Sequence, residues 1–253
     1  MLSPFRHAKR FQSLGFSSKG YFEALLKLIV VDCMHPWLAH PARADASAWM
    51  AELLAGYVTS ADTGNDDLVI ASRAALTDFC EVASGERLSL VYAALMQNLR
   101  SRQGEDRVVV PTLEIVAFLF NCGLFQRCRD MDLRALCLQT QKASYKSGNV
   151  RKIMACVKVY GGVASMSLSD GGEEGGSNGG TAVQEARRRL GALLFHPWPR
   201  VRSVVVDELW GLTGGFDVPE ADGAVVSSPL TGVDWAKADK AMIRGVVQEL
   251  GLA

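Results

Sequence analysis

The stretch that decides the fold runs from Leu190 to Leu212 and reads LGALLFHPWPRVRSVVVDELWGL. Its two halves carry apolar residues three and four positions apart, which is the spacing of one helix face. Between the halves, residues 196–199 read His-Pro-Trp-Pro and predict a turn. Pro199 suits the first turn of the second helix, because the N–H that proline lacks would have no intrahelical partner there. The stretch therefore predicts two helices joined by a short connection.

The same helical spacing recurs along most of the chain, and no run shows the alternation of a strand. From Val108 to Cys122 the residues are apolar nearly all round, which predicts a helix buried between its neighbours and ended by Gly123. The other expected helices span residues 21–31, 44–58, 68–83, 88–99, 132–145, 149–166, 182–195, 200–212 and 234–250.

The spacing of these helices indicates a repeat. Helix starts near Asp66, Asp106 and Asn149 recur at roughly 40 residues, the period of HEAT and armadillo arrays. A turn followed by Val-Arg and small apolar residues, as at 201–205, is also typical of a HEAT unit. We therefore expect an all-α fold, a HEAT/armadillo-like helical-repeat solenoid segment.

Two stretches interrupt the helical pattern. Residues 170–180 read DGGEEGGSNGG, and so many glycines cost too much backbone entropy to order without burial. This predicts a flexible insert between a helical-repeat segment at 1–169 and a C-terminal one at 181–253. Residues 214–232 form a second irregular stretch before the last helix.

Composition limits the function classes. Basic and acidic residues both number 27, so no global field favours nucleic acid or anionic lipid as the partner. The apolar runs are too short to span a bilayer, and the six scattered cysteines suggest a reduced, intracellular protein. Met1–Gly20 has four basic residues and no acid, which fits either a basic amphipathic helix end or, less well, a mitochondrial transit peptide.

Several stretches, taken in order, carry a family resemblance. They are residues 67–80 (DLVIASRAALTDFC), 106–115 (DRVVVPTLEI), 137–153, 196–202 (HPWPRVR) and the Asp-Trp-Ala that opens the last predicted helix at Asp234. Together they resemble the C-terminal region of tubulin-folding cofactor D, from about residue 67 onward and more weakly before it. Members of that family are several times longer, so the chain corresponds to a fragment, a truncated gene product or a separately encoded segment.

This resemblance implies a cytoplasmic chaperone of late tubulin folding. Such a protein holds β-tubulin, joins tubulin-folding cofactors E and C around the tubulin dimer, and binds an Arf-like small GTPase. Tubulin hydrolyses its own GTP in that assembly, so the resemblance implies no catalytic site and no cofactor in this chain. The alternative is a generic HEAT-repeat scaffold that serves another cytosolic complex.

One concentrated run of charge is a candidate protein-binding site. Arg187, Arg188 and Arg189 are followed by Arg200 and Arg202 on the next predicted helix. Guanidinium groups pair with carboxylates in a bidentate manner, and tubulin is acidic, so these arginines are predicted to contact it. The competing interpretation is a solvated helix face, with Arg202 serving the turn itself.

Two further groups are candidate sites. Cys33, His35 and His40 are close enough in sequence to suggest a metal. However, the tripeptide His-Pro-Trp at 35–37 recurs at 196–198, which favours a repeated turn. Ser17 lacks the spacing of a nucleophile elbow. We therefore expect neither metal nor catalytic residues in these places.

Overall fold

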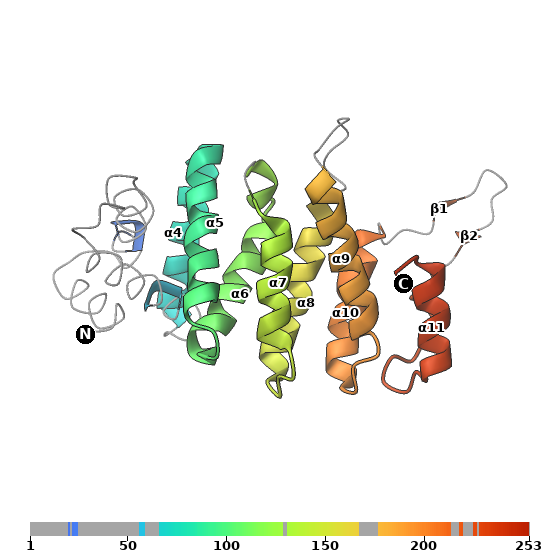
Figure 1. Ribbon diagram of the computed structural model, residues 1–253. Coiled ribbons are helices and arrows are strands. Elements are labelled where there is room, and N and C mark those ends of the chain that lie inside the picture. The colour runs from blue at the N-terminus through green and yellow to red at the C-terminus, as the bar shows by residue number, and fades with distance from the viewer. Residues whose placement is uncertain are drawn as a thin grey trace. The chain divides into compact units, whose positions relative to one another are not determined.

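The computed structural model describes residues 20, 22–24, 56–58, 66–128, 131–166, 177–213, 218–219, 225–226 and 228–252. Its elements are α4 (Asp66–Val82), α5 (Gly85–Ser101), α6 (Asp106–Asn121), the 3-10 turn η4 (Phe125–Arg127), α7 (Leu133–Ser144), α8 (Val150–Ser165), α9 (Ser177–Leu193), α10 (Pro199–Leu212), β1 (Val218–Pro219), β2 (Val225–Val226) and α11 (Lys240–Glu249) (Figure 1). Helices thus dominate the described part of the chain. The prediction of an all-α fold is confirmed, whereas the arrangement of the helices as a repeat array stays a prediction.

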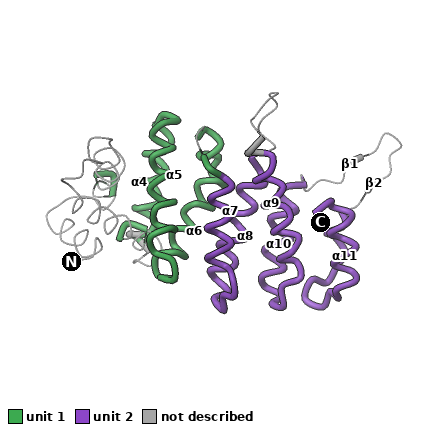
Figure 2. The backbone as a smooth tube through the Cα atoms, viewed as in Figure 1, with its two compact units in different colours: residues 1–132 green, residues 133–253 purple. Residues whose placement is uncertain are grey.

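The chain divides into two compact units, residues 1–132 and 133–253 (Figure 2). In the first unit α5 packs against α6. The α6 helix is buried along most of its length from Val108 to Phe120, as its all-round apolar sequence predicts. Inside this pair the Asn98 side-chain amide donates to the Thr112 hydroxyl at 2.9 Å. Gly123 follows α6 with φ +70°, a left-handed conformation that glycine adopts without strain.

An arginine fixes the end of α4 in the first unit. The Arg127 guanidinium, on η4, donates to the carbonyls of Cys80, Glu81 and Ala83 at 3.3, 3.0 and 2.8 Å. These carbonyls lie at the end of α4, where the helix itself supplies no donors. Phe125 of the same turn is fully buried. The turn therefore holds the end of α4 through the Arg127 cation, while the Phe125 ring packs edge-on against Tyr92 of α5 and Phe120 of α6.

The second unit has two layers of helices. The α7 helix packs beside α9 and α8 beside α10, while α8 also packs against both α7 and α9 (Figure 1). Asn149 caps α8, because its side chain accepts from the Lys152 N–H at 3.2 Å. Pro199 occupies the first turn of α10, as the quoted stretch predicts. The core of this unit lies between the layers and includes Leu136, Val157, Leu190 and Val205.

The end of the chain packs on α9. A Cβ at Gly191 would come within 2.9 Å of the Leu252 backbone oxygen, so only glycine lets this segment approach so closely. Leu252 is buried. The contact joins the last residues to the helix that carries the predicted arginine run.

Several predicted boundaries change. The α9 helix begins at Ser177, so residues 177–180 of the predicted flexible insert are helical, while 170–176 lie outside the described residues. The α11 helix begins at Lys240, six residues later than predicted, because Asp239 and not Asp234 caps it by accepting from the Met242 N–H at 2.8 Å. Within the stretch expected to be irregular, β1 pairs with β2 in an antiparallel manner.

The predicted helices at 21–31 and 44–58 fall mostly outside the described part of the chain. Residues 22–24 and 56–58 within them are helical. Tyr57 is buried, and its hydroxyl donates to the Ser72 carbonyl of α4 at 2.7 Å.

Candidate protein-binding surface

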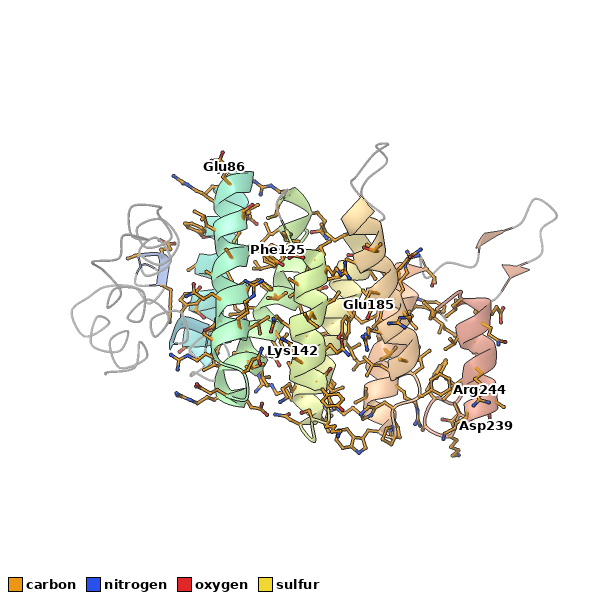
Figure 3. The ribbon with its side chains drawn as sticks, viewed as in Figure 1. Glu86, Phe125, Lys142, Glu185, Asp239 and Arg244 are labelled. Carbon is orange, nitrogen blue, oxygen red and sulfur yellow. The ribbon has the colours of Figure 1, made fainter. Side chains whose placement is uncertain are left out.

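The arginine run on α9 is tied to one acidic residue of its own helix. Glu185 accepts from Arg188 Nη2 at 2.8 Å and from Arg189 Nε at 2.7 Å (Figure 3). Partial burial alone would raise the pKa of the Glu185 carboxyl, but the hydrogen bonds from Arg188 and Arg189 outweigh it and lower the pKa. The carboxylate therefore stays ionised at neutral pH and offsets part of the positive charge.

The same run reaches the neighbouring helix. Arg189 Nη2 donates to the Gln141 side-chain oxygen of α7 at 2.9 Å, which leaves Arg189 half-buried between α7 and α9. Arg187 is half-buried, whereas Arg188 and Arg200 are exposed. Arg188 and Arg200 are thus the members of the predicted site that face solvent most fully.

Arg202 has a different place from the other four arginines. Its side chain is buried, with 8% exposed. Nε donates to the Trp235 carbonyl at 2.7 Å, Nη2 to the Ala236 carbonyl at 2.8 Å, and Nη1 to the His196 carbonyl at 2.9 Å. These bonds join the turn before α10 to the segment before α11. The guanidinium is thus occupied within the fold, as the competing interpretation of Arg202 expects, and its role toward a partner stays a prediction.

The turn before α10 is stabilised by His196. Its Nδ1 accepts from the Trp198 N–H at 3.2 Å, and the two rings lie 4.9 Å apart between centroids. Burial, and then the nearby Arg202 cation, lower the pKa of His196. The imidazole is thus neutral at neutral pH, which its role as an acceptor requires.

A part-buried carboxyl, that of Glu208, lies between α8 and α10. The Glu208 carboxylate packs directly on Gly161, where an added Cβ would lie 2.8 Å from the Glu208 Cδ. Burial raises the pKa of Glu208 to about 7, a rise that Lys158 opposes and Asp207 supports. Glu208 therefore titrates near neutral pH, which the sequence pattern did not indicate.

A second basic region is spread along the chain and forms no run of charge. From residue 133 to 169 the chain has no acid and six bases: Arg134, Lys142, Lys146, Arg151, Lys152 and Lys158. Arg134, Lys142 and Lys146 are exposed on α7 and the turn that follows it. The signal was present as an acid-free stretch, and a count of acids over a long window would have found it.

The remaining candidates of the sequence are Cys33, His35, His40 and Ser17, and all four lie outside the described residues. Among the residues that the structure describes, no group of three His, Cys, Asp or Glu side chains is placed to hold a metal ion. Likewise, no described helix is both long and apolar enough to cross a bilayer.

The buried cysteines are protonated. Burial raises the pKa of Cys80, Cys137 and Cys156 to about 12. A thiolate is the reactive form of cysteine. These three side chains are therefore apolar packing groups at neutral pH.

Comparison with known families decides the identity of the chain. The model of the family described as tubulin folding cofactor D C terminal matches residues 8–152. The chain belongs to this family. The match includes the region before residue 67, where the resemblance is weaker, and also α7. It ends at residue 152, before the α9 arginines and the motif at 196–202. Searches of the curated proteins and of the solved structures found no match.

Proposed function

We propose that this chain is a non-catalytic tubulin-folding chaperone segment that binds β-tubulin in the cytoplasm. The observation that carries the proposal is the family match over residues 8–152. In this proposal the chain joins tubulin-folding cofactors E and C and an Arf-like small GTPase. It aids assembly of the tubulin dimer and the hydrolysis of GTP by tubulin itself.

The helical architecture supports a binding role. Stacked helices in two layers present long faces, on which charged side chains can be displayed without disturbing the core. On α9 and α10, Arg188 and Arg200 are exposed, and Arg187 is half-buried. Exposed charges of this kind speed the encounter with an oppositely charged protein more than they strengthen the final complex. These three arginines would attract an acidic surface of tubulin.

A pulldown tests the proposal. The full chain, immobilised through a tag, should retain purified tubulin, and the retention should fall as salt is added, because exposed charges are screened. A GTP hydrolysis assay provides a second readout, in which the chain alone should release no phosphate. Failure to retain tubulin under low salt, while the chain is folded by circular dichroism, would favour a HEAT-repeat scaffold of another complex.

A further inference from the structure

The outer side of α7 combines exposed apolar groups with exposed cations. Leu138 is 49% exposed and Tyr145 is 68% exposed, although both are large hydrophobic residues. Arg134 and Lys142 are exposed on α7 with Leu138, and Tyr145 directly follows the last residue of the helix, Ser144. Residues four, eight and eleven positions after Arg134 lie on one helix side, so these four side chains share a face. We call this set, together with Lys146, the α7 face.

The opposite side of α7 is the one that packs. Leu136, Cys137 and Thr140 are buried, and the Cys137 thiol lies 3.9 Å from the Ala182 carbonyl of α9. The helix is therefore already anchored in its layer through that side. The side chains of Leu138 and Tyr145 are not part of the packing that holds α7 in place.

Lys146 adds an unusual conformation to this face. It has φ 51° and is the only non-glycine residue with positive φ among the described residues. A residue just after a helix often takes this conformation, but glycine is favoured there because a Cβ is strained. The Lys146 ammonium lies 5.2 Å from the centroid of the Tyr145 ring. The strained backbone thus places a cation beside an exposed aromatic ring.

The sequence that carries the α7 face has no acid after Asp132. The stretch from 133 to 169 contains none. On α9, Glu185 is paired with Arg188 and Arg189. Figure 3 labels Lys142 on α7 and Glu185 on α9. The side chains of Arg134, Lys142 and Lys146 are exposed, so an external anion can reach them.

We propose that the α7 face binds an acidic peptide segment that carries an apolar or aromatic side chain. Arg134 and Tyr145 are eleven residues apart, which corresponds to about 16 Å along a helix and suits a short segment. Carboxylates of the segment pair with Arg134, Lys142 and Lys146, and its apolar side chain covers Leu138 and Tyr145. Tyrosine and arginine are the side chains that protein interfaces favour.

Charge balance favours a peptide over a nucleic acid or a lipid surface. The whole chain has 27 bases and 27 acids, so it lacks the broad positive field that those larger polyanions require. The α7 face is also narrow. The proposal for the α7 face can be tested separately from tubulin binding. It specifies the chemistry of the peptide and not the protein that carries the peptide.

Fluorescence anisotropy tests the site on the full chain. The probe is a fluorescein-labelled glutamate-rich peptide with one central phenylalanine. Two reference peptides replace its glutamates by glutamine or its phenylalanine by serine. We expect the probe to bind, and both reference peptides to bind at least about tenfold more weakly, a difference equivalent to about 1.4 kcal/mol.

Matched variants locate the binding. Lys142→Gln and Tyr145→Ser should each weaken probe binding several-fold, whereas Lys240→Gln and Met242→Ser, exposed residues on α11, should leave it unchanged. Lys146→Gly is the sharpest variant, because glycine relieves the backbone strain and should raise Tm while binding weakens. A merely structural Lys146 would not separate these two effects.

Three results would overturn the proposal. The first is that the probe binds no better than the glutamine peptide. The second is that the α7 variants and the α11 variants affect binding equally. The third is that RNA or vesicles with anionic lipid bind more tightly than the probe and lose binding in the α7 variants, which would assign the α7 face to that ligand.

Discussion

Arg202 and Arg188 lie on consecutive helices of one unit, and their surroundings give them opposite roles. Arg202 is buried and donates to carbonyls from two separate segments. Arg188 is exposed and pairs with Glu185 of its own helix. The residue type is the same for both, so it does not predict the role. What decides it is whether unpaired carbonyls converge on the guanidinium.

The same contrast holds for the acids of this unit. Burial raises the pKa of Glu208 to about 7, whereas hydrogen bonds from two arginines lower the pKa of the part-buried Glu185. Charged groups that are mostly buried therefore affect the free energy of unfolding. Exposed charges instead affect the rate at which a partner associates. Each prediction below tests one side of this difference, beginning with the largest expected effect.

Replacing Arg202 by alanine should cost the most. The carbonyls of Trp235, Ala236 and His196 would lose their donor inside the fold. We expect the free energy of unfolding to fall by about 3 kcal/mol, since hydrogen bonds to charged groups are strong and unmet buried acceptors are costly. Urea denaturation measures it. Arg200→Ala is the matched control, and an equal loss in both variants would contradict the distinction between interior and surface arginines.

Replacing Glu208 by glutamine should change how stability depends on pH. The folded-state pKa of about 7 is raised above the ordinary value of 4.5, so the fold favours the protonated carboxyl. Its contribution is fully present below the unfolded pKa and is lost as pH rises through about 7. Glutamine mimics the protonated form at every pH. At about pH 8 the variant should be more stable than the wild type, by on the order of 2 kcal/mol.

Thermal unfolding at several pH values checks this sign. Near pH 5 the two proteins should have similar Tm, because Glu208 is then mostly protonated. Glu185→Gln is the contrasting variant, since it removes a carboxylate that two arginines hold ionised. A Glu208→Gln protein that is less stable than the wild type at high pH would contradict the burial assigned to this carboxyl.

Arg127 in the first unit gives a smaller effect of the same kind. It binds three carbonyls at the end of α4, but its side chain is exposed. Water can replace its donors, so Arg127→Ala should cost only about 1 kcal/mol. Hydrogen exchange should show the loss in the last turn of α4. If Arg127→Ala lost as much stability as Arg202→Ala, the exposure of an arginine would not determine how much its removal costs.

The helices were predictable where local signals are unambiguous. The all-round apolar pattern predicted the buried α6, and Pro199 marked the first turn of α10. The start of α11 was not predictable in the same way, because the chain offers two aspartates that bind nearby N–H groups. Asp234 accepts from the Ala236 N–H at 3.1 Å in a turn, and Asp239 caps the helix. Arg202 holds the carbonyls of Trp235 and Ala236 from 33 and 34 residues away.

The candidate sites were predictable in part for a similar reason. A run of arginines is visible in the sequence, but the pairing of Arg189 with Gln141 across 48 residues is not. The α7 face is spread over several turns, so it forms no run. The burial of Glu208 depends on the absence of a side chain at Gly161, on another helix. Such sites depend on contacts between elements, which local patterns do not contain.

The arginines of α9 are expected to affect stability least and tubulin binding most. Changing Arg187, Arg188 and Arg189 together to serine should alter the free energy of unfolding by no more than about 1 kcal/mol, because part-exposed ion pairs contribute little. The decisive measurement is the rate at which tubulin associates with the full chain at low salt, for the wild type and for this triple variant. The proposal predicts slower association with dissociation nearly unchanged. Association at the wild-type rate, in a variant that is folded and still binds tubulin, would show that these arginines are only a solvated helix face.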